Sequence, residues 1–434
     1  MFSRRCATAI TLLTLGMLGG CNEASAPPAS TAEKKPNPSE AKASVVIRPG
    51  ANVQDETQTA LIKAKPGDVI TFEAGTFAFT KELSLAVENV TVRGQGMDKT
   101  ILSFKNQDAG KHGLLVTRGK FRIEDLTVED SKGDGLKVND VVDVQFRRVR
   151  ARWTGGEKET NGAYGIYPVQ CTNVLVEDCE AIGASDAGIY VGQSTNVVVR
   201  RCKAMKNVAG IEIENCIDAD VYDNVATGNT GGILVFDMPG LIQKNGKRVR
   251  VHDNQMISNN HVNFAPKGNT VAGVAPGTGS MIMATDQVEL FKNTIKDNQT
   301  YGLIIVSYTN LKKPNEDKEY DPYPEGIYVH DNNFVHDGTE PAGETVLMLV
   351  SILGKPFPEI IYDGAHNPAK MKDGKMPHDL GVYLKNNGSA KFANLGMNAA
   401  KLLTAASPPK IDRDLAAFEG ELPPLSPVKL PGVD

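Results

Sequence analysis

Residues able to transfer protons or to bind a polar polymer recur at equivalent places after a series of glycines. Tyr167 and Tyr190 each follow a glycine–isoleucine pair, and the matching positions before and after them hold Lys137 and Glu212. Glu214 lies two residues beyond Glu212, where alternation along a strand returns a side chain to the same face. Phenol, ammonium and carboxylate groups on one face can act as general acids and bases, or can stack on sugar rings and hydrogen-bond to hydroxyls. The spacing therefore indicates one face that binds or acts on a ligand.

Three further residues are expected near this face. Arg152 and Trp153, the only tryptophan, begin an inserted segment beside the same positions, and Asp237 follows the glycine-led series. An aromatic side chain with neighbouring cations and carboxylates suits a sugar polymer. A hydrolase would need two carboxylates at a set distance, for which Glu212 with Asp186 or Asp237 is a conceivable pair. An ordinary solvated face with scattered tyrosines remains the alternative to a binding groove.

A repeat of about 22 residues must position these side chains. Its spacings are 22, 30, 23, 22 and 22 residues, and the longest contains an insertion. A period of this size fits one coil of three short strands separated by turns. The sequence therefore predicts an all-β fold, a right-handed single-stranded parallel β-helix (solenoid), over residues 45–350. The glycine–apolar pairs that mark the repeat begin at Gly113, Gly135, Gly165, Gly188, Gly210 and Gly232.

A second column of residues lies fourteen, once thirteen, residues after the first five of these glycines, and the same local sequence pattern extends it to Asn254, Asn293 and Asn332. Its members change from apolar residues to cysteine and then to asparagine, which predicts an interior ladder of stacked amides along the coil axis. Cys179 and Cys202 fall on neighbouring rungs, about 4.8 Å apart, so a disulfide is allowed, although stacked free thiols are favoured. The column comprises Leu126, Val149, Cys179, Cys202, Asn224, Asn254, Asn293 and Asn332.

The two ends of a solenoid must be covered, and the sequence offers a cover for each. Residues 54–65 carry helix formers with an apolar stripe of Ala60, Leu61 and Ala64, which predicts an N-terminal capping helix. Beyond about residue 350 the repeat fades into a proline-rich sequence. We expect residues 351–434 to form an irregular C-terminal extension that acts as a cap.

The N-terminal residues have the pattern of a bacterial targeting segment. Arg4 and Arg5 precede an apolar run too short to be a permanent transmembrane helix. The run ends in LGGC, which resembles the bacterial lipobox and implies a signal peptide over residues 1–20 with lipid attachment at Cys21. Asn22 follows this cysteine, which by the same resemblance favours the outer membrane of the cell envelope. Residues 21–44 lack large apolar residues and are expected to be a disordered tether.

Charge and residue spacing exclude some partners. Removal of residues 1–20 leaves 45 basic against 52 acidic residues, a formal charge of −7, which argues against nucleic acid as a partner. No Cys/His spacing typical of zinc is present. Asp218, Asp220 and Asp223 could bind calcium, but a solvated turn is the favoured interpretation, so no cofactor or metal is expected.

Residues 45–350 resemble the pectate-lyase-like superfamily of right-handed β-helices. The opening coils carry the resemblance, in VITFEAGTFAF from Val69 and VTVRGQGMDKTILSF from Val90. Within the superfamily the chain is most similar to the bacterial parallel β-helix repeat lipoproteins, a family whose function is not established. The superfamily also includes polysaccharide lyases, glycoside hydrolases, alginate epimerases and periplasmic copper-site assembly proteins, so the resemblance implies the fold and leaves the activity open.

A local motif resembles that of one catalytic group. YGIYPVQ, residues 164–170, is similar to the YGxDPHD signature of mannuronan epimerases and related lyases. Tyr164, Gly165 and Pro168 keep its frame. Its three reactive positions, however, hold Tyr167, Val169 and Gln170. Valine cannot remove a proton beside a carboxylate, so the epimerase mechanism cannot be carried over.

Two hypotheses about function follow. The first is an exported, non-catalytic lipoprotein whose outward face binds a polysaccharide or a partner protein. The alternative is a polysaccharide-active enzyme, a uronate lyase or epimerase, that uses a non-standard set of residues in the same groove. In that case Lys137 or Arg152 would serve as the base, and Tyr167 or Tyr190 as the acid.

Overall fold

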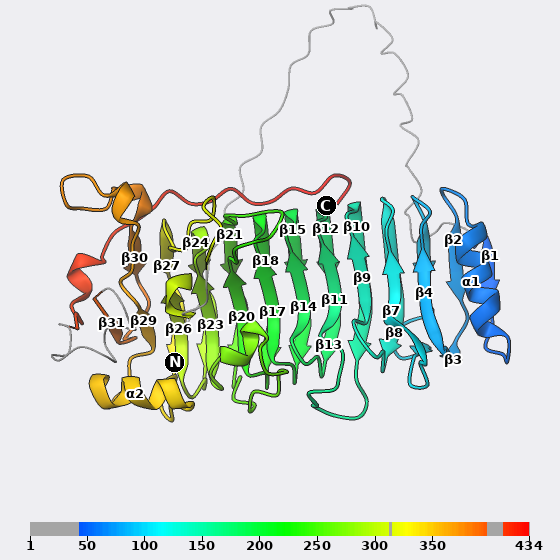
Figure 1. Ribbon diagram of the computed structural model, residues 1–434, viewed down its shortest axis with the longest axis horizontal. Coiled ribbons are helices and arrows are strands. Elements are labelled where there is room, and N and C mark those ends of the chain that lie inside the picture. The colour runs from blue at the N-terminus through cyan, green and yellow to red at the C-terminus, as the bar shows by residue number, and fades with distance from the viewer. Residues whose placement is uncertain (1–42, 312–314, 397–410, 434) are drawn as a thin grey trace, which may run out of the picture. The chain divides into compact units, whose positions relative to one another are not determined.

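The computed structural model describes residues 43–311, 315–396 and 411–433. Within this part the chain winds into coils, because apolar side chains alternate along each short strand. In β21 (Lys247–His252), for example, Val249 and Val251 are buried inside the coil, and Arg250 between them is partly exposed. The strand pairings are parallel and join equivalent residues of successive coils, as in Val174 with Val197 and Val197 with Ala219. The molecule therefore has the predicted right-handed parallel β-helix (Figure 1).

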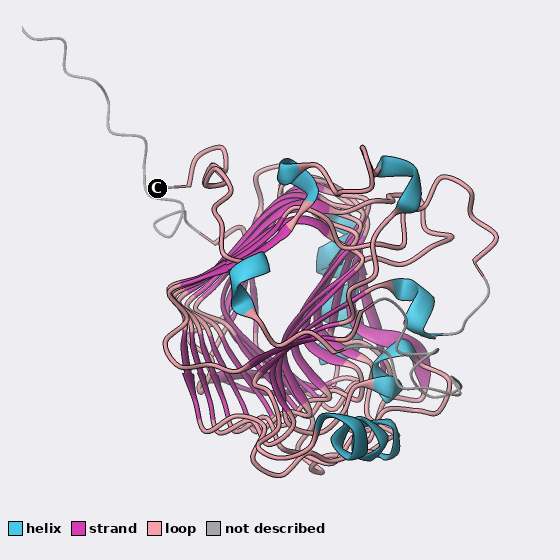
Figure 2. Ribbon diagram, turned by 90° about the vertical axis from the view of Figure 1, so that its left-hand side faces the viewer, coloured by secondary structure: helices cyan, strands magenta, loops and turns pink. Residues whose placement is uncertain are grey.

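The strands stack into walls (Figure 2). Their inward side chains fill the core between the walls. Two walls are continuous and form sheet A, because the long strands β8 and β10 belong to both. The first wall contains β1 (Val45–Ile47), β2 (Val69–Phe72), β5 (Thr91–Arg93), β8 (Phe121–Glu129), β10 (Val142–Arg152), β12 (Thr172–Glu177), β15 (Thr195–Arg200), β18 (Ile217–Tyr222), β21 (Lys247–His252), β24 (Asp286–Phe291), β27 (Ile327–His330) and β30 (Val382–Lys385). The second adds β3 (Gly75–Ala78), β6 (Thr100–Ser103), β13 (Glu180–Ile182), β16 (Lys203–Met205), β19 (Val225–Thr227), β22 (Gln255–Ile257), β25 (Thr294–Lys296) and β28 (Asn333–Val335).

The third wall, sheet B, carries the face predicted from the glycine series. Its strands are β4 (Lys81–Leu85), β7 (Ala109–Val116), β9 (Leu136–Asn139), β11 (Tyr164–Val169), β14 (Ala187–Gly192), β17 (Ala209–Glu214), β20 (Gly231–Phe236), β23 (Thr278–Met283), β26 (Tyr301–Val306), β29 (Ile360–Tyr362) and β31 (Phe392–Asn394).

Two amide ladders run through the interior. The predicted ladder is present: the Asn224 side-chain nitrogen donates to the Asn254 oxygen at 3.0 Å, and the same contact repeats through Asn293 and Asn332 to Asn387. Because each amide nitrogen also donates to a backbone carbonyl, these buried groups are fully paired. A second ladder lies five residues further along each coil and comprises Asn207, Asn229, Asn259, Asn298 and Asp337.

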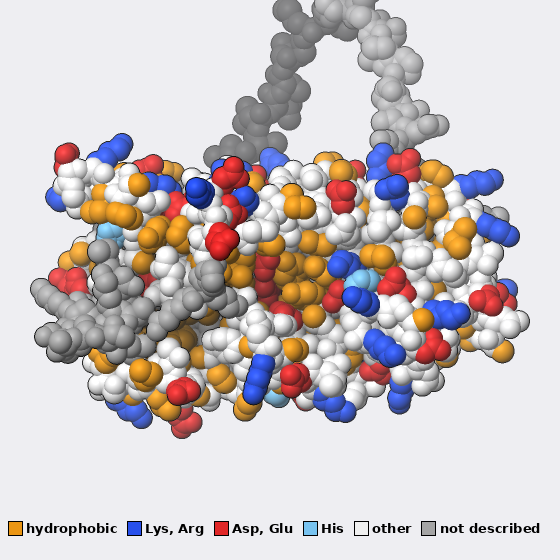
Figure 3. Space-filling model, in the orientation of Figure 1, with side chains coloured by type: hydrophobic (Ala, Val, Ile, Leu, Met, Phe, Trp, Pro, Cys, Tyr) orange, Lys and Arg blue, Asp and Glu red, His pale blue; other side chains and the backbone are white. Residues whose placement is uncertain are grey.

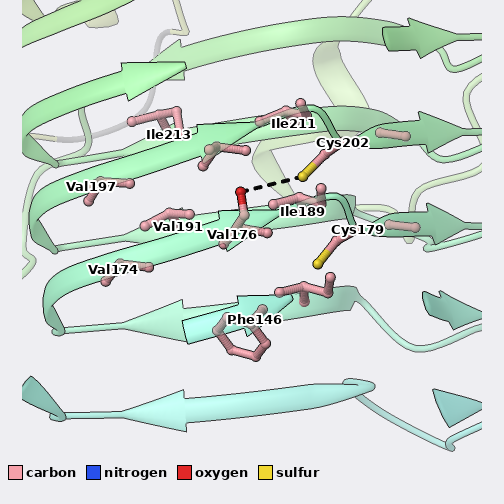
Figure 4. Close-up of a cluster of buried hydrophobic side chains, with 14 of the residues drawn as sticks. Phe146, Val174, Val176, Cys179, Ile189, Val191, Val197, Cys202, Ile211 and Ile213 are labelled. Atoms are coloured by element: carbon pink, nitrogen blue, oxygen red, sulfur yellow. Dashed lines mark hydrogen bonds between the residues drawn. The ribbon is translucent and has the colours of Figure 1, made fainter. Parts of the chain in front are cut away.

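The cysteines continue the first ladder as buried thiols. Cys179 and Cys202 point the same way from neighbouring coils into the apolar interior, next to residues such as Val176 and Ile189 (Figure 4). Both are free, as are Cys171 and Cys216. Burial raises the pKa of the Cys202 thiol well above its ordinary value. Stacked thiols, the favoured alternative, are what the structure contains.

A helix covers the N-terminal end of the solenoid. Helix α1 (Val53–Lys63) buries Val53, Ala60 and Leu61 against the first coil, close to the predicted helix over 54–65. At the other end the coils extend beyond residue 350, where the sequence analysis ended them, since β29, β30 and β31 continue the parallel ladders. Insertions around helix α2 (Glu344–Leu353) hide this continuation in the sequence. The short 3-10 helices are η2 (Thr270–Gly273), η3 (Tyr308–Leu311), η4 (Pro368–Lys370), η5 (His378–Leu380) and η6 (Leu415–Ala417).

The predicted signal peptide, the lipid-attachment residue Cys21 and nearly all of the tether lie outside the described residues. Among the helices that are described, none combines the length and the apolar composition needed to cross a membrane.

Candidate functional site

The outward row of sheet B brings three tyrosines into contact. Strand register aligns Lys137 with Tyr167 and Tyr190 with Glu212, as the glycine series predicted. Tyr164, at the start of β11, completes the tyrosine cluster: its ring centroid lies 4.5 Å from those of both Tyr167 and Tyr190. The Lys137 ammonium lies 4.6 Å from the Tyr167 ring centroid, within cation–π range.

The absence of a side chain at Gly192 determines the orientation of the Tyr190 ring. A Cβ atom at this position would come within 2.2 Å of the Tyr190 hydroxyl, so only glycine lets the ring cross the strand at this point. The ring then reaches the next coil, and its hydroxyl donates to Glu214 Oε1 at 2.9 Å. This contact ties the tyrosine cluster to a group of carboxyl side chains.

Asp186, Glu212 and Glu214 form an acidic cluster beside the tyrosines. Glu212 is 2% exposed and Asp186 is 5% exposed. Burial raises the pKa of Glu212 well above its usual value, and the charges of Asp186 and Glu214 add to this effect. Burial likewise raises the pKa of Asp186 to about 7 and raises that of Glu214. Because neighbouring buried carboxylates cannot all ionise, the cluster retains at least one proton near neutral pH.

An insertion covers this part of the face. The covering loop, residues 258–277 between β22 and β23, packs Val271 and Val274 against Tyr190 and Leu234. Asn269 on the same loop donates to Asp186 Oδ2 at 3.0 Å. Tyr190 is consequently 4% exposed, whereas Tyr167 and Lys137 remain partly accessible.

A cavity adjoins the accessible side of the tyrosine cluster. Its volume is about 450 Å³, and Asp134 at its floor accepts a hydrogen bond from the Tyr164 backbone nitrogen at 3.3 Å. His112 pairs with Asp134 at 3.1 Å, and two exposed lysines lie beside them. We call this space the basic cavity; it is lined by Gly110, Lys111, His112, Lys132, Gly133, Asp134, Asn161, Gly162, Ala163, Ser185 and Pro266. Figure 3 shows a hydrophobic patch over the middle of this face, with acidic atoms on one side and basic and histidine atoms on the other.

Arg152 and Trp153 do not join this cluster. Arg152 ends β10 in sheet A and binds Glu129 there, at 3.0 and 2.8 Å. Trp153 is 7% exposed, and its indole nitrogen donates to the Ser131 carbonyl at 2.8 Å. The ring therefore anchors the base of its insertion and offers no stacking surface, because burial removes it from solvent. The prediction that Arg152 and Trp153 belong to the ligand-binding face is therefore wrong.

Asp237 also takes a structural position. Both of its oxygens accept from the Gly246 backbone nitrogen at 2.9 Å, and its carbonyl accepts from the Tyr320 hydroxyl at 2.6 Å. It is fully buried, and burial raises its pKa to about 8. Asp237 closes the turn after β20, so the structure gives no support to its pairing with Glu212.

The frame of the YGIYPVQ motif forms β11, and its inward residue Ile166 is fully buried. Val169 lies beside Gly192 on the next strand and places no titratable group where the epimerase signature has one.

Sequence reasoning missed several residues of the site. Tyr164 and Asp134 directly precede glycines of the repeat, which is a signal that could have found them. His112 likewise directly precedes Gly113, a glycine of the repeat, whereas Asn269 comes from an insertion that no period positions.

The described residues hold no group of three or more His, Cys, Asp or Glu side chains arranged to bind a metal ion. Two of the three carboxylates considered for calcium pair with cations: Asp218 with Arg248 at 2.5 Å, and Asp220 with Arg250 at 2.6 Å.

Comparison with known proteins agrees with this architecture. The family model described as "right handed beta helix region" matches residues 86–245. No curated protein matches the chain. The A-module of the Azotobacter vinelandii mannuronan C-5 epimerase AlgE4 is 15% identical, covers 79% of this chain and 93% of its own, and has a TM-score of 0.52. An alginate lyase from Paenibacillus sp. str. FPU-7 is 17% identical over 69% of this chain and 99% of its own, with a TM-score of 0.44. The chain is a right-handed parallel β-helix protein.

Proposed function

We propose that the chain binds an acidic polysaccharide along the outer face of sheet B. The observation that carries this proposal is Lys137 stacked over Tyr167 beside the basic cavity. A tyrosine ring can stack on the C–H groups of a sugar, and nearby ammonium groups can pair with uronate carboxylates. The chain as a whole is acidic, so lysines gathered at one cavity favour an anionic ligand there. We further propose that a lipid on Cys21 holds the protein in the cell envelope, at the outer membrane.

The burial of the groups that could transfer protons favours ligand binding without catalysis. Tyr190 and Glu212 lie under the covering loop, and burial raises the pKa of each. Neither is placed to exchange protons with a ligand in the basic cavity. The epimerase-like motif also offers valine where a base would be required.

A uronate lyase or epimerase is the second candidate, because one observation favours it. The Tyr190 hydroxyl donates to Glu214, and burial raises the pKa of the neighbouring Glu212 well above its usual value, so these groups could form an acid–base relay. The relay would meet a substrate once the covering loop is displaced.

Affinity electrophoresis in gels containing alginate, polygalacturonate or neutral dextran tests the first proposal. We expect the acidic polymers alone to retard the protein, and Lys137→Ala or Tyr167→Ala to weaken the retardation at least fivefold. Lys203→Ala is the matched control, since Lys203 is exposed on sheet A and loses the same charge. If no glycan retards the protein, the polysaccharide proposal is wrong and the ligand of this face is instead a partner protein. Unsaturated product seen by ultraviolet absorbance, and lost in Glu214→Gln, would instead support the lyase.

A further inference from the structure

The proline-rich segment, residues 421–432, lies on the outside of sheet A, away from the proposed polysaccharide face. Figure 1 shows it in red, running back over β24, β21, β18 and β15. Burial within it recurs at every third residue: Leu422, Leu425 and Val428 are partly buried between exposed prolines and polar residues, and Leu430 is 9% exposed. No backbone hydrogen bond joins its residues to one another before the turn at Leu430. These are the features of a polyproline II helix, which has three residues per turn and no internal hydrogen bonds.

One column of outward residues lies under this segment. Strand register aligns these residues from coil to coil, and they include two carboxylates separated by Arg250. The Leu425 nitrogen donates to Glu289 Oε2 at 2.9 Å, and the Val428 nitrogen donates to Asp220 Oδ2 at 3.4 Å. The column comprises Leu175, Val198, Asp220, Arg250, Glu289, Tyr328 and Tyr383.

The repeat of the segment matches the repeat of the coils. Three residues of polyproline II span about 9.3 Å. Two coils span about 9.6 Å at the usual strand spacing. Leu425 and Val428 are three residues apart, and their acceptors Glu289 and Asp220 are two coils apart. Two successive turns of the segment therefore each meet a carboxylate at an equivalent position of the coils.

The two acceptor carboxylates also have partners outside the segment. Asp220 and Glu289 are 3% and 4% exposed. Arg250 and His252 hold Asp220 at 2.6 and 2.8 Å, and His330 holds Glu289 at 3.2 Å. The two histidines belong to a row of parallel rings: His252 lies 5.0 Å from Tyr222 and 4.6 Å from Phe291. Tyr222 of this row packs in one cluster with Leu430 of the segment, and Tyr328 lines the cavity beside Leu425. Aromatic side chains line the usual receptors for polyproline II peptides.

The segment fills this groove loosely. A cavity of about 530 Å³ remains where residues 422–426 cross β24 and β27. Beyond it, Leu430 packs on Leu175 and Val198, and Glu421 pairs with Lys385 at the other end.

We propose that this column is a recognition groove for proline-rich peptides in the polyproline II conformation, with the chain's own segment as its resident occupant. The groove takes a peptide with an apolar residue at every third position, and its two carboxylates accept backbone N–H groups spaced by one turn. A proline-rich segment of a partner protein with this spacing competes for the same place.

The test uses the full-length protein carrying Val428→Asp and Leu430→Asp, which release the segment, and a fluorescent peptide of residues 419–434. Faster tryptic cleavage after Lys429 reports release. We expect saturable binding by fluorescence anisotropy, at least tenfold tighter than to the unsubstituted protein, whose groove is occupied. Glu289→Gln in the released protein should weaken binding at least fivefold.

Peptide variants distinguish specific recognition of the two backbone N–H donors from nonspecific binding of the peptide. Proline in place of Leu425 and Val428 removes the two donors while keeping the conformation, so it should weaken binding at least tenfold. Proline in place of Ser426, an exposed position, is the matched control and should bind like the parent peptide. If the substituted segment stays protected from trypsin, a protease site inserted between Gly420 and Glu421 frees it instead. A released groove that fails to bind the peptide, or that binds both variants equally, overturns the proposal.

Discussion

At the scale of single residues, the chemistry of sheet B depends on burial. Glu212 and Asp186 are ordinary acids in the sequence, and they become unusual because the covering loop and neighbouring carboxyls disfavour their charged forms. An acid whose pKa is raised on folding binds more protons in the folded state. Its contribution to stability is therefore lost as pH rises from its unfolded value toward its folded value.

Glu212→Gln should test this dependence. The amide removes the cost of ionising a buried group, so we expect the variant to gain stability relative to the unsubstituted protein by about 1 kcal/mol or more between pH 5 and pH 8. Urea denaturation at the two pH values measures the difference. Glu340→Gln, at an exposed position, controls for the loss of one charge. A difference that does not change with pH would show that Glu212 is ionised throughout.

Gly192→Ala tests the geometry of Tyr190. The new Cβ meets the Tyr190 hydroxyl, so the ring must leave Glu214, and we expect a loss of about 1 to 3 kcal/mol. The same substitution in a Tyr190→Ala background should cost much less, since the clashing group is gone. Equal costs in both backgrounds, measured by chemical denaturation, would mean that the strand itself rejects alanine.

At the scale of elements, the amide ladders hold neighbouring coils in register. Each Asn side chain both donates and accepts along the axis, so removing one takes a hydrogen-bond partner from each of its two neighbours. Buried polar groups that lose their partners cost about 1 to 3 kcal/mol each.

Asn254→Leu should accordingly destabilise the protein by about 2 to 5 kcal/mol, because Asn224 loses its acceptor and Asn293 loses a donor. Thermal and urea unfolding followed by circular dichroism measure the change. Asn333→Leu is the control, since Asn333 is exposed on β28 and outside both ladders. Similar losses from the two substitutions would contradict a special role for the ladder.

At the scale of the whole molecule, an uncovered coil would present unpaired strand edges to other molecules. Helix α1 prevents this at the first coil, where Leu61 is 2% exposed and its neighbour Ile62 is 68% exposed.

Leu61→Asp should therefore displace the helix and produce oligomers that grow with protein concentration. Ile62→Asp, which places the same charge on the solvent side, should leave the protein unchanged. Size-exclusion chromatography with light scattering distinguishes the two. Monomeric Leu61→Asp of normal stability would show that the first coil needs no cover.

Much of the fold could be predicted because every coil of a solenoid repeats the same sequence features. Gly188 and Gly210 mark the period, and alternation around Ile189 and Ile211 fixes which side chains face inward. The second ladder was not predicted, although Asn207 and Asn229 lie five residues after Cys202 and Asn224, respectively. The predicted end of the β-helix at residue 350 lies before its last coils, because the insertions between β28 and β30 interrupt the period of the repeat.

Strand alternation and a fixed period suffice to predict the outward row that runs from Lys137 through Tyr167 and Tyr190 to Glu212, because they leave a side chain no other face. Which of those groups solvent can reach depends on how the folded chain packs. Insertions follow no period, so their contacts depend on packing across coils: they bury Trp153, place Asn269 on Asp186 and enclose the acidic cluster. For the same reason the path of the proline-rich segment could not be read from its residues, since its binding partners Asp220 and Glu289 are brought to it by the winding of the chain.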